Sequence, residues 1–455
     1  MTTIAFTADD LAALTARGIS VDEATRQVAL LRRPPRALEL DRPCRVGDGI
    51  TVLTGEQERL AFERGQQAIH QARVTKFVPA SGAATRMFKD LLTAVAAAGR
   101  PSEQPGARTF FEQLDHYAFA EELRVRAGVS GGLHSETEER QLLRTLLESM
   151  RYAELPKGLI PFHRADPPST AFDDQLEEGV GYTRDATGRV RMHFTVPPEW
   201  RTAFGHRLDA IRGRLETRLG CALDVTFSEQ YQSTDTLAID EHGEPFRTAS
   251  GALLFRPAGH GALISNLAAL GGDIVVIKNI DNVLPPSRVA DVVRWKTILI
   301  GVLAELQQQA AGALERPLRV CGVVRNEGEP GGAPFWVRGA GAAPTIQIVE
   351  SAQIDAGSEA QRTVFASSTH FNPVDVVCGV RDASGRSFVL EDFVDPATAF
   401  VARKSYEGRN LLALERPGLW NGAMARWQTV CVEVPASTFA PVKTVLDLLR
   451  PQHLV

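Results

Sequence analysis

Short apolar runs and helix-like patterns alternate along most of this chain. Several runs have the length and composition of buried strands, and they begin at Val74, Arg189, Ala222, Asp273, Leu318 and Thr345. Between them, apolar residues recur at helical spacing, as in "AFGHRLDAIRGRLETRLG" (203–220) and "VADVVRWKTILIGVLAELQQQ" (289–309). Strands that alternate with helices predict an α/β fold with a mixed, mostly parallel central sheet flanked by helices.

The remaining parts of the chain predict three further regions. The stretch "TADDLAALTARG" begins with Thr7 as a helix cap and ends at Gly18, and the pattern stays helical up to residue 72. Two more helical patterns, in residues 100–150, follow the first strand–helix unit as an insertion. We therefore expect an N-terminal helical segment (1–72), an α/β core (73–395) with a helical insertion (100–150), and a C-terminal segment (396–455) that ends in a helix.

Composition and charge narrow the class of protein without identifying it. Apolar residues make up 44% of the 455 residues and charged residues 23%, which is ordinary for a globular chain. The formal net charge of −5 leaves no basic surface for nucleic acid. The five cysteines lack metal-ligand spacing, the start of the chain lacks a basic signal-peptide region, and no apolar segment is long enough to cross a membrane. We expect a cytoplasmic protein with reduced thiols, no nucleic-acid partner and no membrane association, in an oligomeric state that stays open.

The stretch "PASGAATRM" (79–87) places small residues where a strand passes into a helix. Small residues allow close approach of the backbone, and N–H groups at a helix start favour anions. Thr85 and Arg86 follow directly, and Arg86 would add a delocalised cation to a phosphate site. The pattern matches neither a P-loop nor a dinucleotide-binding loop, so a purely structural turn is the alternative.

Two lysines stand close to prolines in contexts that suit a phosphate contact. Lys157 lies between Pro156 and Gly158, and Lys443 follows Pro441 at the start of a predicted amphipathic helix. A cation at a helix N-terminus is unfavourable unless an anion lies between them. The alternatives are a solvated loop lysine for Lys157 and a surface lysine for Lys443.

Polar residues after the predicted strand at 274–278 suit a metal ion. Asn279, Asp281 and Asn282 bring oxygen ligands to the carboxyl end of a buried strand, which is the donor type that Mg²⁺ prefers. An Asx turn before the following prolines is the alternative interpretation.

A tripeptide of two glycines around a histidine, Gly259-His260-Gly261, precedes a helical run. It would let a base or ribose approach the backbone, and a histidine of no chemical interest is equally compatible. We interpret Trp420-Asn421-Gly422 as packing beside a turn.

Taken together, these stretches resemble the UDP-sugar pyrophosphorylases of the UDP-glucose and UDP-N-acetylhexosamine types. The similar segments follow the family's order over about residues 74–450, and they are "VPASGAATRM", "PKGLIPF", "FSEQ", "RPAGHGA", "NIDN", "IQIVESAQI", "HFNPVD" and "FAPVKTVLDLL". The blocks "KFVPASGAATRMFK", "GLWNGAM" and "PVKTV" most resemble a bacterial family known only as a domain of unknown function.

The resemblance implies a GT-A-like nucleotidyltransferase core and Mg²⁺-dependent transfer from a nucleoside triphosphate, with UTP expected, to a sugar 1-phosphate. It implies catalytic charges at Arg86, Lys157, Asp281 and Lys443, with Asp281 as the metal ligand. It implies nucleotide binding by Ala80, Ser81, Gly82, Ala83, Ala84, Thr85, Gln230, Gly259, His260 and Gly261. It implies substrate binding by Asn282, Glu350 and Asn372.

Two other functions would use the same pocket. One is hydrolysis of a nucleotide sugar, and the other is binding of a nucleotide or nucleotide sugar without catalysis. Ala84 stands where the similar enzymes have a second loop glycine, and a Cβ there that crowded the phosphates would favour the non-catalytic alternative. The identities of the sugar and the base are not encoded in the segments that carry the resemblance.

Overall fold

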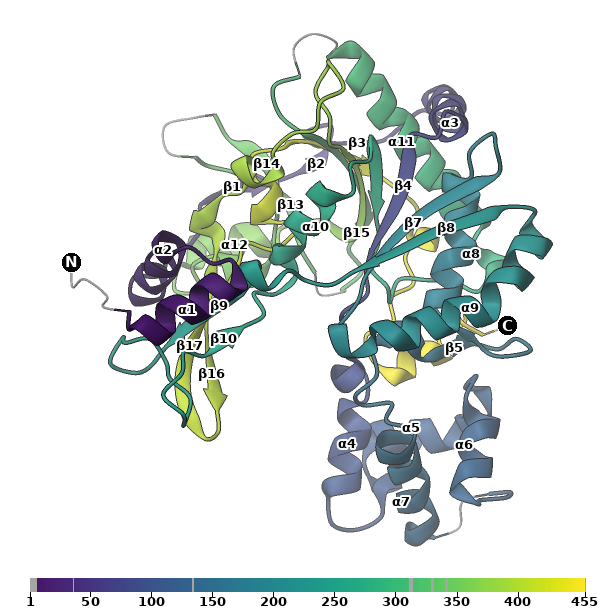
Figure 1. The fold of residues 1–455 in the computed structure, drawn as a ribbon. Coiled ribbons are helices and arrows are strands. Elements are labelled where there is room, and N and C mark those ends of the chain that lie inside the picture. The colour runs from purple at the N-terminus through teal and green to yellow at the C-terminus, as the bar shows by residue number, and fades with distance from the viewer. Residues whose placement is uncertain are drawn as a thin grey trace. The chain divides into compact units, whose positions relative to one another are not determined.

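The computed structural model describes residues 6–35, 37–132, 135–310, 314–328, 331–339 and 343–454. The chain forms two compact units, and each consists of several separate stretches of sequence. Unit 1 contains Met1–Ala61, Ser228–Val275 and Leu299–Val434, and unit 2 contains Phe62–Phe227, Val276–Ile298 and Pro435–Val455. The division passes through strand β11 (Ile274–Ile277) and through helices α3 (Gly55–His70) and α11 (Ala290–Gln309). Figure 1 shows the course of the chain.

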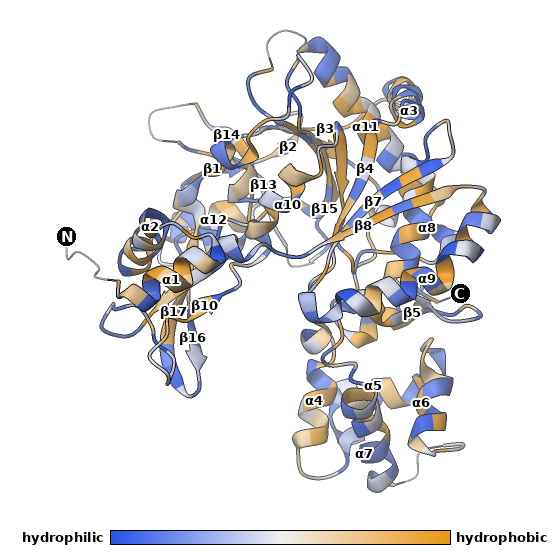
Figure 2. Ribbon diagram, in the orientation of Figure 1, coloured by the Kyte–Doolittle hydropathy of each residue, from blue (hydrophilic) through white to orange (hydrophobic). Residues whose placement is uncertain are grey.

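Unit 1 carries its part of the large sheet at its centre. Strand β12 runs parallel to β18 and antiparallel to β15, and β18 runs parallel to β3, which runs parallel to β2. These strands are β2 (Arg45–Val46), β3 (Gly49–Thr51), β12 (Leu318–Arg325), β15 (His370–Gly379) and β18 (Gln428–Glu433). All residues of β15 are buried, and the strand carries hydrophobic colours in Figure 2.

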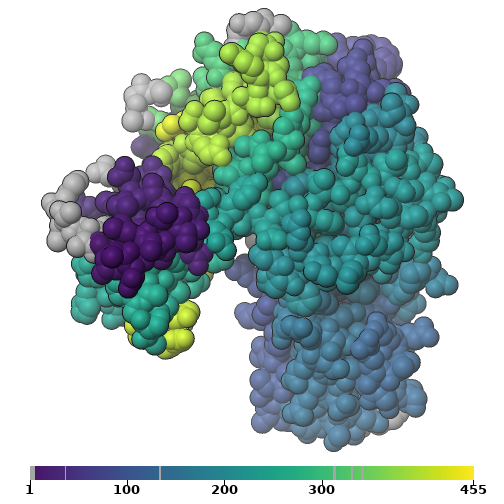
Figure 3. All heavy atoms as spheres, viewed as in Figure 1, coloured from purple at the N-terminus to yellow at the C-terminus, as the bar shows by residue number. Residues whose placement is uncertain are grey.

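Two smaller sheets complete unit 1. One has the order β10-β9-β17-β16 and the other the order β1-β13-β14. Their strands are β9 (Thr236–Ile239), β10 (Phe255–Arg256), β16 (Phe400–Tyr406), β17 (Arg409–Glu415), β1 (Leu40–Pro43), β13 (Ala333–Val337) and β14 (Thr345–Val349). The helices of this unit are α1 (Ala8–Arg17), α2 (Val21–Arg32), α10 (Ile264–Ala269) and α12 (Glu359–Ala366). Residues of α1 and α2 share an apolar cluster with β9 and β17, and Figure 3 shows the purple N-terminal helices beside teal and yellow-green atoms.

The N-terminal prediction is confirmed for the first helix. The Thr7 side chain accepts from the Asp10 N–H, the Asp10 carboxylate accepts from the Thr7 N–H, and Gly18 ends the helix with φ of 72°. This capping box and left-handed C-cap are the local signals that the sequence displayed. Residues 1–72 also contain the short strands β1, β2 and β3, which their helical pattern did not predict.

Unit 2 has parallel strands, a buried central helix and a helical insertion. Strand β4 runs parallel to β7, with Phe77 opposite His193. The strands are β4 (Val74–Pro79), β5 (Pro161–His163), β6 (Ser169–Thr170), β7 (Arg189–Thr195) and β8 (Ala222–Ser228). The helices are α4 (Lys89–Ala96), α5 (Pro105–Glu112), α6 (Ala120–Ala127), α7 (Glu136–Arg144), α8 (Ala171–Thr183) and α9 (Arg201–Leu219). The mixed α/β fold with a mostly parallel large sheet flanked by helices is therefore confirmed.

The predicted C-terminal helix is a short 3₁₀ segment, Val445–Leu449. The Asp447 carboxylate accepts from the main-chain N–H groups of Lys443 and Thr444, which tightens the chain into a turn before the segment. Lys443 therefore precedes this turn and does not begin an amphipathic α-helix. The expectation of an α-helix here was wrong because the segment is too short: the Thr444–Asp447 capping box starts a helical turn, and the turn ends at Leu449, since Arg450 precedes Pro451.

All five cysteines are free thiols, and four of them are buried. Cys321 on β12 lies directly opposite Cys431 on the parallel neighbour β18. The reduced state was expected, whereas this pairing between residues far apart in sequence was not.

Candidate functional site

Asp281 lies in the loop that follows β11, and two lysines from distant parts of the chain contact its carboxylate. Lys157 Nζ is 2.9 Å from Asp281 Oδ2, and Lys443 Nζ is 3.1 Å from the same oxygen. Asp281 and Lys157 are almost covered, with side-chain exposures of 10% and 11%, whereas the Lys443 side chain is 57% exposed. All three belong to unit 2. The structure thus brings together the aspartate and both lysines that the sequence singled out.

Main-chain contacts fix this arrangement. The Val442 N–H donates to the Asp281 carbonyl at 2.9 Å, and Lys157 Nζ donates to the Val442 carbonyl at 2.8 Å. The Asn282 side chain accepts from the Ala440 N–H at 3.0 Å. The C-terminal segment is therefore bound along the Asp281 loop, and Lys443 is the next residue of that segment.

The pKa of Asp281 is the net result of two opposing effects. Burial raises the pKa of this carboxyl, and the charges and hydrogen bonds of Lys443 and Lys157 more than offset burial, so the pKa lies below its ordinary value. Asp281 is therefore an ionised carboxylate at neutral pH, held between two ammonium groups.

The loop of small residues is attached to the Lys157 segment. The Lys157 N–H donates to the Gly82 carbonyl at 3.1 Å, and the Ala84 N–H donates to the Leu155 carbonyl at 2.9 Å. The Thr85 hydroxyl donates to the Ala153 carbonyl at 2.9 Å. The loop and Lys157 consequently form one structural piece, although 68 positions separate Thr85 from its partner Ala153.

Part of this loop is open to a ligand and part is not. Ser81, Gly82 and Ala83 are exposed, and their main-chain N–H groups have no hydrogen-bond partner among the described residues. Ala80 is buried and donates its N–H to the Thr195 carbonyl at 2.8 Å. This N–H is therefore not free for the nucleotide contact that was expected of Ala80. The exposed Arg86 has no ion-pair partner in the described part of the chain.

Ala84 also lacks the exposed position that was expected of a nucleotide-binding residue. The residue is completely buried, and its side chain belongs to the apolar core that includes Met87 and Phe88. Its methyl group therefore packs inward, and its N–H is already bonded. A glycine at this position is not needed to leave room on the exposed side of the loop.

Close packing around position 158 explains why a glycine follows Lys157. A Cβ at this position would lie 2.9 Å from two ring carbons of Phe204 and 3.3 Å from Ile280. The absence of a side chain lets the Lys157 turn pack closely against α9 and the residues before Asp281. This glycine is needed for close packing, and the packing in turn fixes the position of Lys157.

The oxygen donors at Asp281 could bind a divalent ion only if a bound substrate supplied further oxygen ligands. No group of three or more His, Cys, Asp or Glu side chains among the described residues could hold a metal by itself. Mg²⁺ is commonly bound by one or two carboxylates together with substrate phosphates. Asp281 supplies one such carboxylate, and its Oδ1 has a single long contact, 3.4 Å from Lys443 Nζ. The residues therefore fit an ion that is shared with phosphate oxygens.

Asn282, which was expected to contact substrate, forms a hydrogen bond within the protein. Its side chain is 2% exposed, and its Oδ1 accepts from the Ala440 N–H. The residue connects the Asp281 loop to the C-terminal segment and so supports the position of Lys443. The Nδ2 of Asn282 is enclosed and has no hydrogen-bond partner among the described residues, so the direct substrate contact stays a prediction.

In unit 1, the predicted histidine loop contacts the loop at Trp420. The rings of His260 and Trp420 stack with their centroids 4.2 Å apart and an interplanar angle of 14°. The Leu419 N–H donates to His260 Nδ1 at 3.0 Å, so this nitrogen carries no proton. Partial desolvation lowers the pKa of His260 to about 4. The histidine is therefore neutral, with Nε2 as its donor.

The glycines beside His260 are required by the backbone. Gly259 has φ of 78°, in the left-handed region that glycine favours. A Cβ on Gly261 would overlap the Pro417 carbonyl oxygen. These two residues allow the close packing of the His260 loop against the segment that leads to Trp420. The interpretation of Trp420 as packing alone therefore missed its contact with a predicted site residue.

The remaining predicted residues of unit 1 have different environments. Burial raises the pKa of Glu350, although hydrogen bonds from Trp420 and Asn421 act in the opposite direction. Gln230 has an enclosed Nε2 with no hydrogen-bond partner among the described residues. Asn372 differs from the expected sugar contact because its buried side chain donates to the Gly322 carbonyl and accepts from the Val374 N–H.

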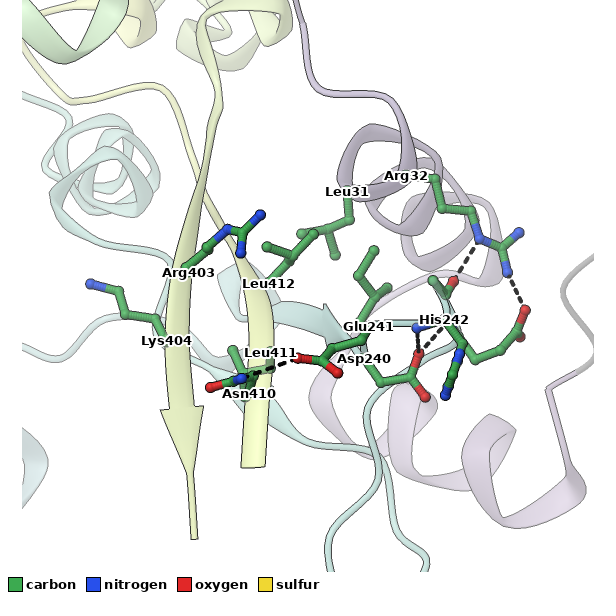
Figure 4. Close-up of a pocket in the computed structure, with 13 residues that line it drawn as sticks. Leu31, Arg32, Asp240, Glu241, His242, Arg403, Lys404, Asn410, Leu411 and Leu412 are labelled. Atoms are coloured by element: carbon green, nitrogen blue, oxygen red, sulfur yellow. Dashed lines mark hydrogen bonds and ion pairs between the residues drawn. The ribbon is translucent and has the colours of Figure 1, made fainter. Parts of the chain in front are cut away.

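A separate cavity of about 780 Å³ lies in unit 1 beside α2 and β16. Figure 4 shows its wall, where Arg32 contacts Glu244 and the Asn410 side chain donates to Glu241. Its lining contains none of the predicted site residues. The cavity therefore does not bear on the predicted chemistry.

Comparisons with known proteins agree with the fold. The chain is similar to the UDP-N-acetylglucosamine pyrophosphorylase of Trypanosoma brucei, with a TM-score of 0.55, 15% identity, and coverage of 98% of this chain and 79% of that one. It is also similar to the UDP-glucose pyrophosphorylase of Leishmania major, with a TM-score of 0.52, 15% identity, and coverage of 98% and 79%. A structure described as the UDP-glucose phosphorylase of Trypanosoma brucei has a TM-score of 0.53, 15% identity, and coverage of 97% and 77%.

The comparison with curated proteins found no match. Among the described residues, no helix has the length and apolar character needed to span a membrane. A family model described as "Domain of unknown function (DUF4301)" matches residues 7–315 and 310–454. The chain therefore belongs to the DUF4301 family, and its fold is that of the UDP-sugar pyrophosphorylases.

Proposed function

We propose that this protein transfers a nucleotidyl group from a nucleoside triphosphate, with UTP as the expected donor, to a sugar 1-phosphate. The observation that carries the proposal is the contact of Lys157 and Lys443 with Asp281, next to an exposed loop that Lys157 also holds. The similarity in fold to enzymes described as UDP-sugar pyrophosphorylases supports the same reaction class.

The proposed reaction exchanges one phosphoanhydride bond for another. An oxygen of the sugar 1-phosphate attacks the α-phosphorus of the triphosphate, the bond from that phosphorus to the bridging oxygen breaks, and pyrophosphate leaves with the bond electrons. The attacking phosphate is mostly ionised at neutral pH because its second pKa is about 6. No general base is needed, and catalysis consists of positioning and charge neutralisation.

The residues of unit 2 supply the charges for this step. The free N–H groups of Ser81, Gly82 and Ala83, with the guanidinium of Arg86, would bind the departing pyrophosphate. Lys443, which is half exposed, would move from Asp281 to the reacting phosphates, and Lys157 would stay on the nucleotide side. Asp281 would hold Mg²⁺, which when bound supplies Lewis-acid stabilisation of the α-phosphate charge.

The predicted binding residues of unit 1 are kept as proposals by themselves. The unpartnered amide of Gln230 and the neutral His260, with its glycines, suit hydrogen bonds to a nucleobase. Glu350 is proposed for sugar hydroxyls on the resemblance alone, because its carboxylate already accepts hydrogen bonds from Trp420, Asn421 and the Gln353 N–H. The other assignments are proposals that rest on the resemblance and on the environment of each side chain.

The non-catalytic alternative loses the support that Ala84 would have given it. Its methyl group lies in the core and cannot crowd a ligand on the exposed side of the loop. We therefore favour the enzyme over a binding protein, and we keep hydrolysis as a possible outcome of the test.

The test is a panel of nucleoside triphosphates and sugar 1-phosphates with Mg²⁺ and a pyrophosphate readout. Pyrophosphate release that requires both substrates supports the proposal, and it should be lost in D281N. Phosphate release without a sugar phosphate identifies hydrolysis of the triphosphate, and release of a nucleoside monophosphate from an added nucleotide sugar identifies hydrolysis of the nucleotide sugar. Nucleotide-dependent thermal stabilisation without turnover identifies a binding protein. Wild-type rates in D281N would refute the assignment of Asp281.

A further inference from the structure

Helix α8 carries polar side chains on a turn that is completely enclosed by protein. Asp174, Gln175 and Glu178 are at most 1% exposed, and none of them was singled out from the sequence. Buried amides and carboxylates are costly unless they are hydrogen-bonded. Each of these residues contacts a segment of the chain that lies close in sequence to the exposed loop, Lys157, Asp281 or Lys443.

Glu178 is the centre of a buried ion cluster. Its carboxylate contacts Lys76 Nζ at 3.2 Å, Lys278 Nζ, and the Tyr182 hydroxyl at 2.7 Å. Lys76 lies in the strand before the exposed loop, and Lys278 immediately precedes the Asp281 loop. Glu178 therefore joins strand β4, which leads to the exposed loop, and the residue that directly follows β11 before the Asp281 loop.

Gln175 contacts the Asp281 loop directly. Its Nε2 donates to the Asn279 carbonyl at 2.7 Å, with longer contacts to the carbonyls of Asn282 at 3.4 Å and Ile280 at 3.5 Å. The main-chain carbonyl of Gln175 accepts from Lys76 Nζ at 2.6 Å, so the residue is attached to the ion cluster as well. A single carboxamide thus fixes the backbone on both sides of Asp281.

Asp174 is connected by hydrogen bonds to the two remaining segments, the one after the Lys157 turn and the one after Lys443. Its Oδ2 contacts His163 Nδ1 at 2.7 Å, and its Oδ1 accepts from the Ser169 hydroxyl at 2.6 Å. His163 Nε2 contacts His453 Nδ1 at 2.9 Å. His163 follows the Lys157 turn, and His453 follows the segment that carries Lys443. All of these residues belong to unit 2.

We propose that this turn of α8 is the positioning element of the site and that Gln175 is the positioning residue for Asp281. The inference rests on the proposed function, because it assigns Asp281 a role in the reaction. Packing alone does not explain the turn, since an apolar side chain would fill the same space without hydrogen bonds to the Asp281 loop. Residues that orient a metal-binding side chain commonly change activity by about 10–100-fold when they are replaced.

The test compares Q175M with Q27M. Methionine has nearly the shape of glutamine and lacks its hydrogen bonds, and Gln27 is a matched control in unit 1. Gln27 is 1% exposed and its Oε1 accepts from the Leu237 N–H at 2.9 Å. Both variants should lose similar thermal stability. Only Q175M should increase amide hydrogen exchange in residues 276–285 and lower kcat by about 10–100-fold.

The two readouts separate this inference from the proposed function. Faster exchange over 276–285 in Q175M but not in Q27M supports positioning even if no nucleotidyl transfer is found for the wild type, which would refute the proposed function alone. Unchanged exchange in Q175M, or an equal change in Q27M, would overturn the inference even if the wild type is active. Q175N keeps the carboxamide with a shorter reach and provides the same comparison if Q175M does not fold.

Discussion

Lys443 Nζ lies 3.1 Å from Asp281 Oδ2, although the two residues are 162 positions apart in the chain. The lysine is largely exposed, and its partner is almost covered. An exposed ammonium group beside an enclosed carboxylate can exchange that partner for a bound phosphate at little cost to the fold. This relationship leads to the first prediction.

Replacing Lys443 by alanine should reduce nucleotidyl transfer by about 10²–10³-fold, because one preorganised charge at the reacting group is lost. Stability should change by no more than about 1 kcal/mol, since a half-exposed ion pair contributes little. Steady-state kinetics and chemical denaturation would check both statements. K404A is the matched control, because the Lys404 side chain is 42% exposed and lies 3.8 Å from Glu415. Equal losses of activity in both variants would contradict the role of Lys443.

Gly82 and Gly158 should respond in opposite ways to alanine. A Cβ on Gly82 meets nothing within 4 Å, whereas one on Gly158 lies 2.9 Å from the Phe204 ring. G82A should therefore keep the stability of the wild type and weaken nucleotide binding, because the methyl group would project from the loop proposed to hold phosphates. G158A should lose about 1–3 kcal/mol by overpacking. Thermal unfolding and nucleotide titration would distinguish them, and unchanged nucleotide affinity in G82A would argue against the phosphate loop.

Removal of the Glu178 charge should be strongly destabilising. E178Q leaves Lys76 and Lys278 buried without their carboxylate, and breaking a buried pair in this way costs about 3–5 kcal/mol. E177Q is the control from the same helix, because Glu177 pairs with the half-exposed Arg218 and should change stability by about 1 kcal/mol or less. Denaturant unfolding of both variants would measure the difference. A small effect of E178Q would mean that the cluster does not hold its strands together.

The buried Lys76 should make stability increase with pH. Burial lowers the pKa of Lys76 to about 7, and the unfolded value is about 10.4. Between these values the unfolded chain binds more protons than the folded one, so the free energy of unfolding rises as pH increases from about 7 to 10. K76M lacks this group, and the stability difference between wild type and K76M should therefore grow more favourable to the wild type across pH 7–9. A difference independent of pH would show that Lys76 keeps its proton in the fold.

The sequence predicted those parts of the site whose signals are local. The strand before Asp281, the turn around Lys157 and the cap of α1 all depend on neighbouring residues, and the structure has them where the pattern placed them. Asp281, Lys157 and Lys443 could be named because prolines, glycines and amides mark their surroundings.

Other features depend on partners that lie far away in sequence. Glu178 belongs to an acidic stretch that has the composition of a solvated helix face, and only Lys76 and Lys278 make its burial possible. Asn372 and Asn282 looked available for substrate, and a distant backbone group occupies one end of each carboxamide, the Gly322 carbonyl for Asn372 and the Ala440 N–H for Asn282. Trp420 was interpreted as packing because its stacking partner, His260, is 160 positions earlier in the chain. Such contacts leave no mark in the neighbouring sequence.

The inward direction of the Ala84 methyl group affects how members of this family can be found. At this position the side chain belongs to the apolar core, so its methyl group does not occupy the exposed side of the loop. A motif search that insists on glycine here will pass over chains such as this one. A search that scores backbone shape and the spacing to the later aspartate and lysines will retain them.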